Sequence, residues 1–203
     1  MTTSAMTALR RLRQPPATAA AASRCEFCAQ PLAEQHEHVV ALASGELSCA
    51  CIACALLFEH PDQPLRRLPR DARYLAGFDL EPQEWASLQI PVKLAFITVS
   101  AENGAVQARY PSPGGVVTAP LERSLWDELR ARHTGLRALQ PGLEALLLNY
   151  LERPHQLFLV PLDRCYRLVG LVRTAWTGFS GGPEVRRQVR DFCAELRGGT
   201  SHA

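Results

Sequence analysis

Apolar and β-branched runs along the chain predict five strands. Two short runs at residues 38–42 and 47–49 flank a Ser-Gly-Glu turn, which predicts a first hairpin. A longer run at 92–99 is followed by Asn103-Gly104, a dipeptide typical of tight hairpins, and residues 105–110 return as its partner. We expect this strand to stop at the Pro- and Gly-rich loop 111–115. The fifth strand is a short buried one over residues 156–160.

Apolar positions spaced three or four residues apart predict helices in the rest of the chain. A short helix begins at Pro82, and four longer patterns follow it. Their apolar positions are Leu121, Leu125 and Leu129; Leu143, Leu146, Leu147, Tyr150 and Leu151 after Pro141; Leu162, Cys165, Val169 and Val172; and Val185, Val189, Phe192, Cys193 and Leu196 between Pro183 and Gly198-Gly199. A hairpin, one more strand and several helices indicate an α+β domain rather than repeated βαβ units.

Five of the seven cysteines are clustered between residues 25 and 54. Cys25-Glu-Phe-Cys28 and Cys51-Ile-Ala-Cys54 are CxxC pairs separated by about twenty residues, which is the spacing of a structural zinc site. Two intervening residues let both thiolates reach one ion, and the predicted hairpin brings the second pair beside the first. We therefore predict a closed tetrahedral site with Cys25, Cys28, Cys51 and Cys54 as ligands, whose metal helps so small a module to fold.

Three neighbours of this site leave alternatives open. Cys49 shares the strand alternation of Cys51 and is an alternative third ligand, although the CxxC turn favours Cys51. His36 and His38 are substitute ligands, but polar side chains at a strand entrance explain them as well. Zinc is the predicted metal, while four thiolates also suit a rubredoxin-like iron or an iron–sulfur cluster.

Two other sets of residues suggest a catalytic or an anion-binding site. Cys165 and His155 suggest a nucleophile and its base, but Cys165 lies on an apolar helix face, so we expect it and Cys193 to pack in the core. The turn at 179–184 contains Gly181-Gly182 and resembles an anion-binding nest, yet no phosphate-loop lysine follows. A glycine-capped turn is therefore expected, and no catalytic constellation is predicted.

These features predict an α+β protein in which a small zinc-ribbon-like β-hairpin module precedes an α+β domain with a short antiparallel sheet and several helices. We expect a flexible N-terminal segment at 1–23 and the metal module at 24–59. A Pro- and Arg-rich connector at 60–80 then leads to the α+β domain at 81–198 and a tail at 199–203.

Charge and targeting signals narrow the class of protein. The formal net charge is only +2, which argues against a dedicated nucleic-acid binder. No apolar run approaches the roughly 18–20 residues of a membrane span. The Arg-containing leader lacks a signal-peptide core, although it resembles an organelle transit peptide, and clustered cysteines suit a reducing compartment. We expect a cytoplasmic protein.

The chain resembles an uncharacterised bacterial family of hydrogenase-associated proteins, encoded beside NiFe-hydrogenase genes of the actinobacterial, oxygen-tolerant type. The resemblance covers nearly everything beyond the first twenty residues. It rests on Cys25-Glu-Phe-Cys28, Ser44-Gly-Glu-Leu-Ser-Cys-Ala-Cys51, Ile90-Pro-Val92, Tyr110-Pro-Ser-Pro113 and the run 161–185. It implies a role in hydrogenase biogenesis or function without naming a reaction.

The leading hypothesis is a non-enzymatic accessory protein whose metal-stapled ribbon contacts a hydrogenase subunit or maturation factor. The alternative is a rubredoxin-like redox or metal-delivery protein, which the additional thiol of Cys49 suggests. A zinc-ribbon regulator that binds nucleic acid is a third hypothesis, and the charge balance disfavours it.

Overall fold

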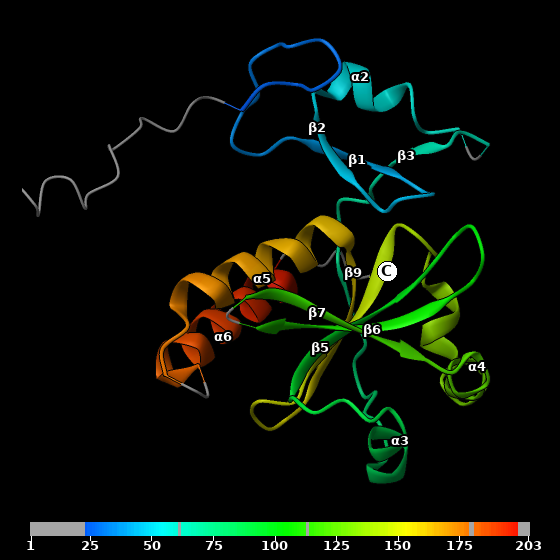
Figure 1. Cartoon of the computed structure of the whole chain (residues 1–203), viewed down its shortest axis with the longest axis vertical. Coiled ribbons are helices and arrows are strands. Elements are labelled where there is room, and N and C mark those ends of the chain that lie inside the picture. The colour runs from blue at the N-terminus through cyan, green and yellow to red at the C-terminus, as the bar shows by residue number, and fades with distance from the viewer. Residues whose placement is uncertain (1–22, 61, 113, 179–180, 199–203) are drawn as a thin grey trace, which may run out of the picture.

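Two antiparallel sheets organise the computed structural model, which describes residues 23–60, 62–112, 114–178 and 181–198 (Figure 1). The smaller sheet holds β1 (Glu37–Ala41), β2 (Leu47–Ala50) and β3 (Leu65–Arg67) in the order β2-β1-β3. Gly45 takes a φ of +72° in the turn between β1 and β2, a conformation that glycine adopts without strain. The predicted first hairpin is confirmed, and we call this part of the chain, residues 23–60 with β3, the ribbon.

The connector at 60–80 contributes one strand to each sheet. Its β3 pairs with β1 of the ribbon, and β4 (Arg73–Tyr74) pairs with β9 (Gln156–Pro161) at the edge of the larger sheet. Its arginines also hold the ribbon, since Arg67 Nε donates to Glu37 Oε2 at 2.9 Å and Arg70 pairs with the same carboxylate. Burial raises the pKa of Glu37, but these two guanidiniums outweigh it and hold the pKa below its ordinary value.

The larger sheet has six strands in the order β4-β9-β8-β5-β6-β7, and every neighbouring pair is antiparallel. Its two central strands, β5 (Leu94–Val99) and β8 (Glu144–Asn149), are buried at every position. Such continuous burial requires a layer on each face of the sheet. Strands β6 (Val106–Ser112) and β7 (Gly115–Leu121) extend it outward.

Two predictions for this sheet were wrong. The expected helix over 143–151 is strand β8, because its leucines face both layers: Leu146 and Leu148 pack in one core and Leu147 in the other. The four residues Ala145–Leu148 at the centre of β8 are all apolar and carry no period, so helix and strand look alike in sequence. The strand expected to stop at residue 111 continues: Pro111 and Ser112 belong to β6 and pair with β7, beyond the part of β6 that pairs with β5.

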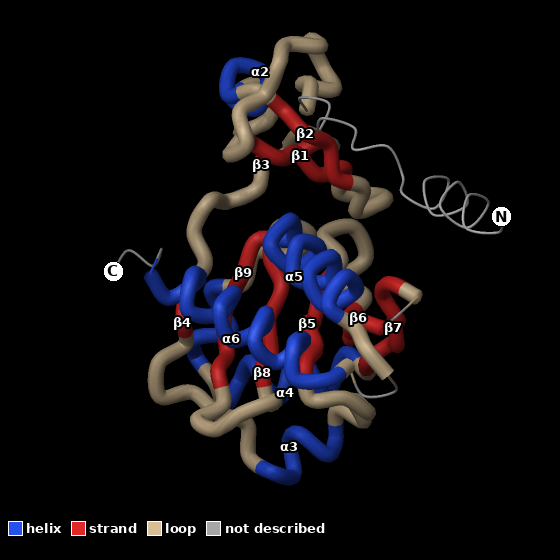
Figure 2. The backbone as a smooth tube through the Cα atoms, turned by 90° about the vertical axis from the view of Figure 1, so that its left-hand side faces the viewer, coloured by secondary structure: helices blue, strands red, loops and turns tan. Residues whose placement is uncertain are grey.

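Helices cover both faces of the larger sheet (Figures 1 and 2). On one face lie α5 (Leu162–Ala175) and α6 (Gly182–Gly198), whose apolar sides pack on Phe96 and Phe158. On the other lie α3 (Pro82–Ser87), α4 (Arg123–Arg132) and a 3-10 turn at Thr134–Ala138, which enclose Ile97. The four helices match sequence predictions, and the α+β fold class with a preceding strand module is confirmed.

The ribbon packs against the larger domain through one face of its sheet. Val40 is fully buried in the same core as α5 and α6, and Leu42 and Leu47 pack against that core. The opposite face carries Val39, which is buried with Cys25 and the short helix α2 (Ile52–Leu56). Alternation along β1 therefore sends successive side chains to the domain and to the cysteines.

Within the described ranges, no helix has both the length and the apolar character needed to cross a bilayer. The segments expected to be flexible at 1–23 and to form a tail at 199–203 lie outside the described residues, except for Ser23. The proposed domain boundaries stay a prediction.

The ion pair between Arg73 and Glu144 generates a stability prediction. Glu144 is 1% exposed, accepts from Arg73 Nη2 at 2.6 Å, and so ties the connector to β8. Arg73→Ala leaves the buried carboxylate without its counter-charge, and we expect the free energy of unfolding to fall by about 2 kcal/mol, less than for a fully enclosed pair because Arg73 is partly solvated. Urea denaturation measures the loss.

Arg187→Ala is the matched control, because Arg187 pairs with Glu184 on an exposed helix surface. We expect a change within about 0.5 kcal/mol for that variant. Equal urea midpoints for the two variants would contradict the importance of the buried pair.

Candidate metal centre

The first pair of cysteines lies in a tight loop ahead of the ribbon sheet. The Cys25 amide donates to Gln30 O at 2.8 Å, and the Ala29 amide donates back to Cys25 O at 2.8 Å. These two bonds close the loop, with Ala29 at a φ of +60°. The CxxC spacing therefore folds as expected, because the turn brings Cys28 back beside Cys25.

The second pair is formed where β2 runs into α2. Cys51 is the residue immediately before α2, and its sulfur accepts the Cys54 amide at 3.5 Å, in the manner of a helix-capping side chain. The Ala55 amide bonds to Cys51 O at 2.9 Å. One helical turn thus places Cys54 on the same side as Cys51.

Glu26 joins the two halves of the site. Its amide donates to Cys49 O at 2.9 Å, and its carboxylate accepts the Cys49 amide at 2.6 Å. Both polar backbone groups of Cys49 are therefore held by one residue of the first loop. This pair of bonds sets the first loop against β2 and fixes the distance between the cysteine pairs.

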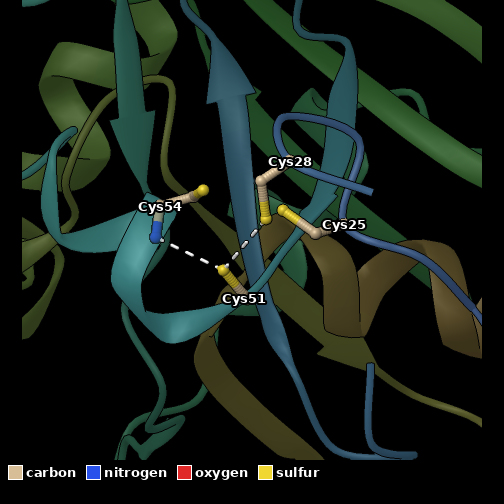
Figure 3. Close-up of side chains that lie close together, drawn as sticks. All are labelled: Cys25, Cys28, Cys51 and Cys54. Carbon is tan, nitrogen blue, oxygen red and sulfur yellow. Dashed lines mark hydrogen bonds between the residues drawn. The ribbon is translucent and has the colours of Figure 1, made fainter. Parts of the chain in front are cut away.

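The four predicted ligands converge, as Figure 3 shows. Their sulfurs all lie within 4.8 Å of one another, and the Cys28 and Cys51 sulfurs are 3.7 Å apart. Tetrahedral zinc with Zn–S bonds of about 2.3 Å separates its sulfurs by about 3.8 Å. The cluster thus fits a metal ion: Cys25 is buried at its base, and Cys28 is exposed at its rim.

Thiol ionisation shows why this cluster suits a cation. Burial raises the pKa of Cys25, but hydrogen bonds from backbone amides of both pairs outweigh it and lower the pKa to about 6. Hydrogen bonds with the sulfurs of Cys51 and Cys28 raise the pKa of Cys54 to about 12. The four sulfurs cannot all be thiolates side by side without a positive charge between them, and a divalent metal supplies it.

A closed all-sulfur site supports structure rather than substrate binding. The cluster is able to bind a metal ion, and its sulfur-only donors suit zinc or iron. Zinc stays our prediction, with iron as the alternative.

Cys49, His36 and His38 lie apart from this set. They form a second group of their own, in which one ligand atom from each lies within 4.8 Å of the others. Burial is the first cause that raises the pKa of Cys49, and the charges of Glu26 and Cys25 add to it. From sequence, Cys49 is an alternative third ligand or an additional thiol for redox or metal delivery, and the histidines are substitute ligands or surface residues; their grouping is not predicted. The missed signal was the His-x-His alternation facing Cys49 across the hairpin.

Cys165, His155 and Cys193, the other candidate residues, each have neighbours that give them a structural role. Cys165 is buried in α5, and burial raises its pKa well above the ordinary value. His155 Nδ1 instead lies 2.9 Å from Asp79 Oδ2, and its ring packs on Tyr150. Cys193 is also buried.

The glycine turn before α6 is described only in part. The Thr177 amide donates to Gly181 O at 3.2 Å, and Glu184 forms an ion pair with Arg187 within α6. Residues 179–180, part of the suggested anion-binding nest, lie outside the described residues.

A family model matches residues 24–200 of the chain, and its description is a family of unknown function, DUF5947. The chain belongs to the DUF5947 family. The match starts just before Cys25 and covers both the ribbon and the larger domain. No curated protein and no solved structure matched this DUF5947 chain.

Removal of single thiols tests the ligand assignment in this DUF5947 protein. Cys25→Ser or Cys54→Ser should release the metal of the four-cysteine site and unfold the ribbon, since metal binding of this kind contributes on the order of 10 kcal/mol to folding. Cys49→Ser should keep that metal, because Cys49 lies outside the cluster. Elemental analysis after dialysis against a weak chelator, with hydrogen exchange across β1 and β2, measures both effects.

The reverse pattern would refute the assignment. If Cys49→Ser released this metal while Cys51→Ser retained it, Cys49 rather than Cys51 would be the third ligand.

Proposed function

We propose that this protein is a non-enzymatic accessory factor whose metal-stapled ribbon binds a protein partner in the assembly, maturation or function of a NiFe hydrogenase. The observation that carries the proposal is an apolar surface beside the cysteine cluster. Among the described residues, five large hydrophobic side chains are exposed, and four of them lie in the ribbon. They are Phe27, Ile52, Leu56 and Leu57.

These four side chains, which we call the apolar tip, come from the two metal-binding turns. Phe27 lies between Cys25 and Cys28, and the other three lie in α2 or directly after it. Leu57 is 71% exposed and Ile52 56%, a degree of exposure that is costly in water unless a partner covers it. The helix α2 lies on the side of the ribbon away from the larger domain (Figure 1), so the domain does not cover the tip.

The metal would hold this tip rigid. Phe27 is next to one ligand pair and packs against Phe58, with ring centroids 5.0 Å apart, while Ile52 lies between the ligands Cys51 and Cys54. Fixing the four sulfurs on one ion therefore fixes the backbone that carries the apolar side chains. A surface ordered in advance loses less conformational entropy on binding.

The class of partner rests on the family resemblance seen in the sequence, which associates such chains with NiFe hydrogenases. An apolar surface of this kind suits a protein rather than a nucleic acid, and the charge of +2 agrees. A hydrogenase subunit or a maturation factor is the partner that we expect.

Charge reversal on the apolar tip tests the proposal. Tagged full-length protein expressed in the native host should recover a hydrogenase subunit or maturation factor, identified by mass spectrometry. The double variant Ile52→Glu/Leu57→Glu should reduce recovery at least about tenfold, because a buried unpaired carboxylate costs more than 1.4 kcal/mol. Both side chains are exposed, so the metal content of the variant should stay unchanged.

Val117→Glu is the matched control, since Val117 is an exposed apolar residue on β7 of the larger domain. It should leave recovery unchanged. The proposal is refuted if no hydrogenase-pathway protein is recovered and deletion of the gene leaves hydrogenase activity normal.

A redox or metal-delivery role is the second candidate, and the exposed Cys28 at the rim of the cluster favours it. Electron or metal transfer requires contact between the site and solvent or a partner. Tightly bound zinc without a visible absorption band or redox change would rule out the electron-transfer form of this candidate.

A further inference from the structure

We propose that His36, His38 and Cys49 form a second metal site, distinct from the four-cysteine cluster, which binds a divalent transition ion such as Zn²⁺ and leaves one coordination position open. One ligand atom from each residue lies within 4.8 Å of the others. The proposal concerns the purified chain alone, and it goes beyond the partner binding proposed above.

Strand geometry brings the three residues together. His38 and Cys49 are direct partners in the β1–β2 register, so their side chains emerge next to each other on one face. His36 lies directly ahead of β1, two positions before His38, and its ring lies beside that of His38. Its ring centroid is 4.8 Å from that of His38. This face of β1 is the one that carries Val40 into the larger domain.

The imidazole of His36 is oriented as a ligand. Its Nδ1 lies 3.0 Å from the carbonyl oxygen of Ala33, which accepts only if Nδ1 carries the proton. The lone pair is then on Nε2. That nitrogen is buried and has no hydrogen-bond partner within the described part of the chain. Buried polar atoms are seldom left unsatisfied, and a metal ion would complete this one.

The imidazole of His38 is held by a carboxylate from the larger domain. Its Nδ1 lies 3.1 Å from Asp163 Oδ2, in the first turn of α5. A carboxylate on one ring nitrogen orients the ring and makes the other nitrogen a better ligand, an arrangement common around zinc-binding histidines. Asp163 Oδ1 is also buried without a hydrogen-bond partner among the described residues.

The donor set decides the class of ion and the character of the site. Two imidazoles and one thiolate suit Zn²⁺, Co²⁺ or Ni²⁺ better than the oxygen-seeking Mg²⁺ or Ca²⁺. Three protein ligands leave the fourth tetrahedral position to water or to an incoming group, unlike the closed four-cysteine site. Asp163 would act on His38 rather than on the ion, because it is outside the group of converging ligand atoms.

Cobalt titration of the full chain tests the second site. The four-cysteine site is loaded with zinc, weakly bound metal is removed by dialysis against a mild chelator, and Co²⁺ is then added. We expect one further equivalent to bind, with visible d–d bands and a weak charge-transfer band from a single thiolate. His36→Gln, His38→Gln and Cys49→Ser should each weaken this equivalent at least about 100-fold, and Asp163→Asn about 10–100-fold.

His60→Gln is the matched control, because His60 is an exposed histidine of the ribbon that is 67% accessible. It should bind the second equivalent as the wild type does. Zinc retained in the four-cysteine site, measured on each variant, shows that the ribbon is still folded.

The proposal is overturned if the wild-type chain binds no second equivalent, or if Asp163→Asn and the three ligand variants bind it unchanged. The first result involves no substitution, and a ribbon variant that failed to fold could not bind the second equivalent unchanged, so misfolding cannot produce either result. Failure to recover a hydrogenase-pathway partner would leave the wild-type stoichiometry untouched, so the two proposals fail separately.

Discussion

The crowding of four cysteine sulfurs within 4.8 Å of one another is the constraint on which the ribbon depends. If all four are thiolates, their negative charges repel one another. Loop closure at Ala29, capping of α2 by Cys51 and the two hydrogen bonds between Glu26 and Cys49 all bring the cysteines together. Burial raises the pKa of Cys25, but backbone amides outweigh it and lower the pKa to about 6, while hydrogen bonds with the neighbouring sulfurs raise that of Cys54 to about 12. A divalent ion between the sulfurs would compensate their negative charge, and under our proposal the same ion would hold the apolar tip in place.

The ribbon also depends on the larger domain, because its strands are too short to bury a core alone. One face of β1 covers the cysteines with Val39, and the other enters the domain core with Val40. The buried carboxylate of Glu37 then receives two arginines from the connector. The connector and the larger domain thus each contact a different part of one small sheet, and a metal ion in the cysteine cluster would hold a third part.

Local chemistry explains which parts of this structure the sequence could predict. Two CxxC turns bring their own sulfurs together, and α5 and α6 show a helical period because only one side of each is buried. Strand β8 shows no period, since both its faces are buried, and it was mistaken for a helix. The pairings of β3 and β4 with distant strands have no local signature.

The convergence of His36, His38 and Cys49 could not be predicted for the same reason, because it requires the register of β1 on β2 and the contact with α5. Once the hairpin register is known, His38 opposite Cys49 becomes a direct consequence. Sequence therefore singled out every residue of both clusters, yet it predicted a joint role only for the four cysteines of the two CxxC turns.

The two clusters depend on each other unequally. Glu26 holds both backbone groups of Cys49, and Glu26 itself lies between the ligands of the closed site. Loss of the metal from the four cysteines would free that loop and release the backbone that positions the Cys49 thiol. Loss of an ion from the histidines would leave the CxxC turns, α2 and the apolar tip intact. If both proposed sites bind metal, we expect the closed site to load first and to position the open one, because Glu26 links the two.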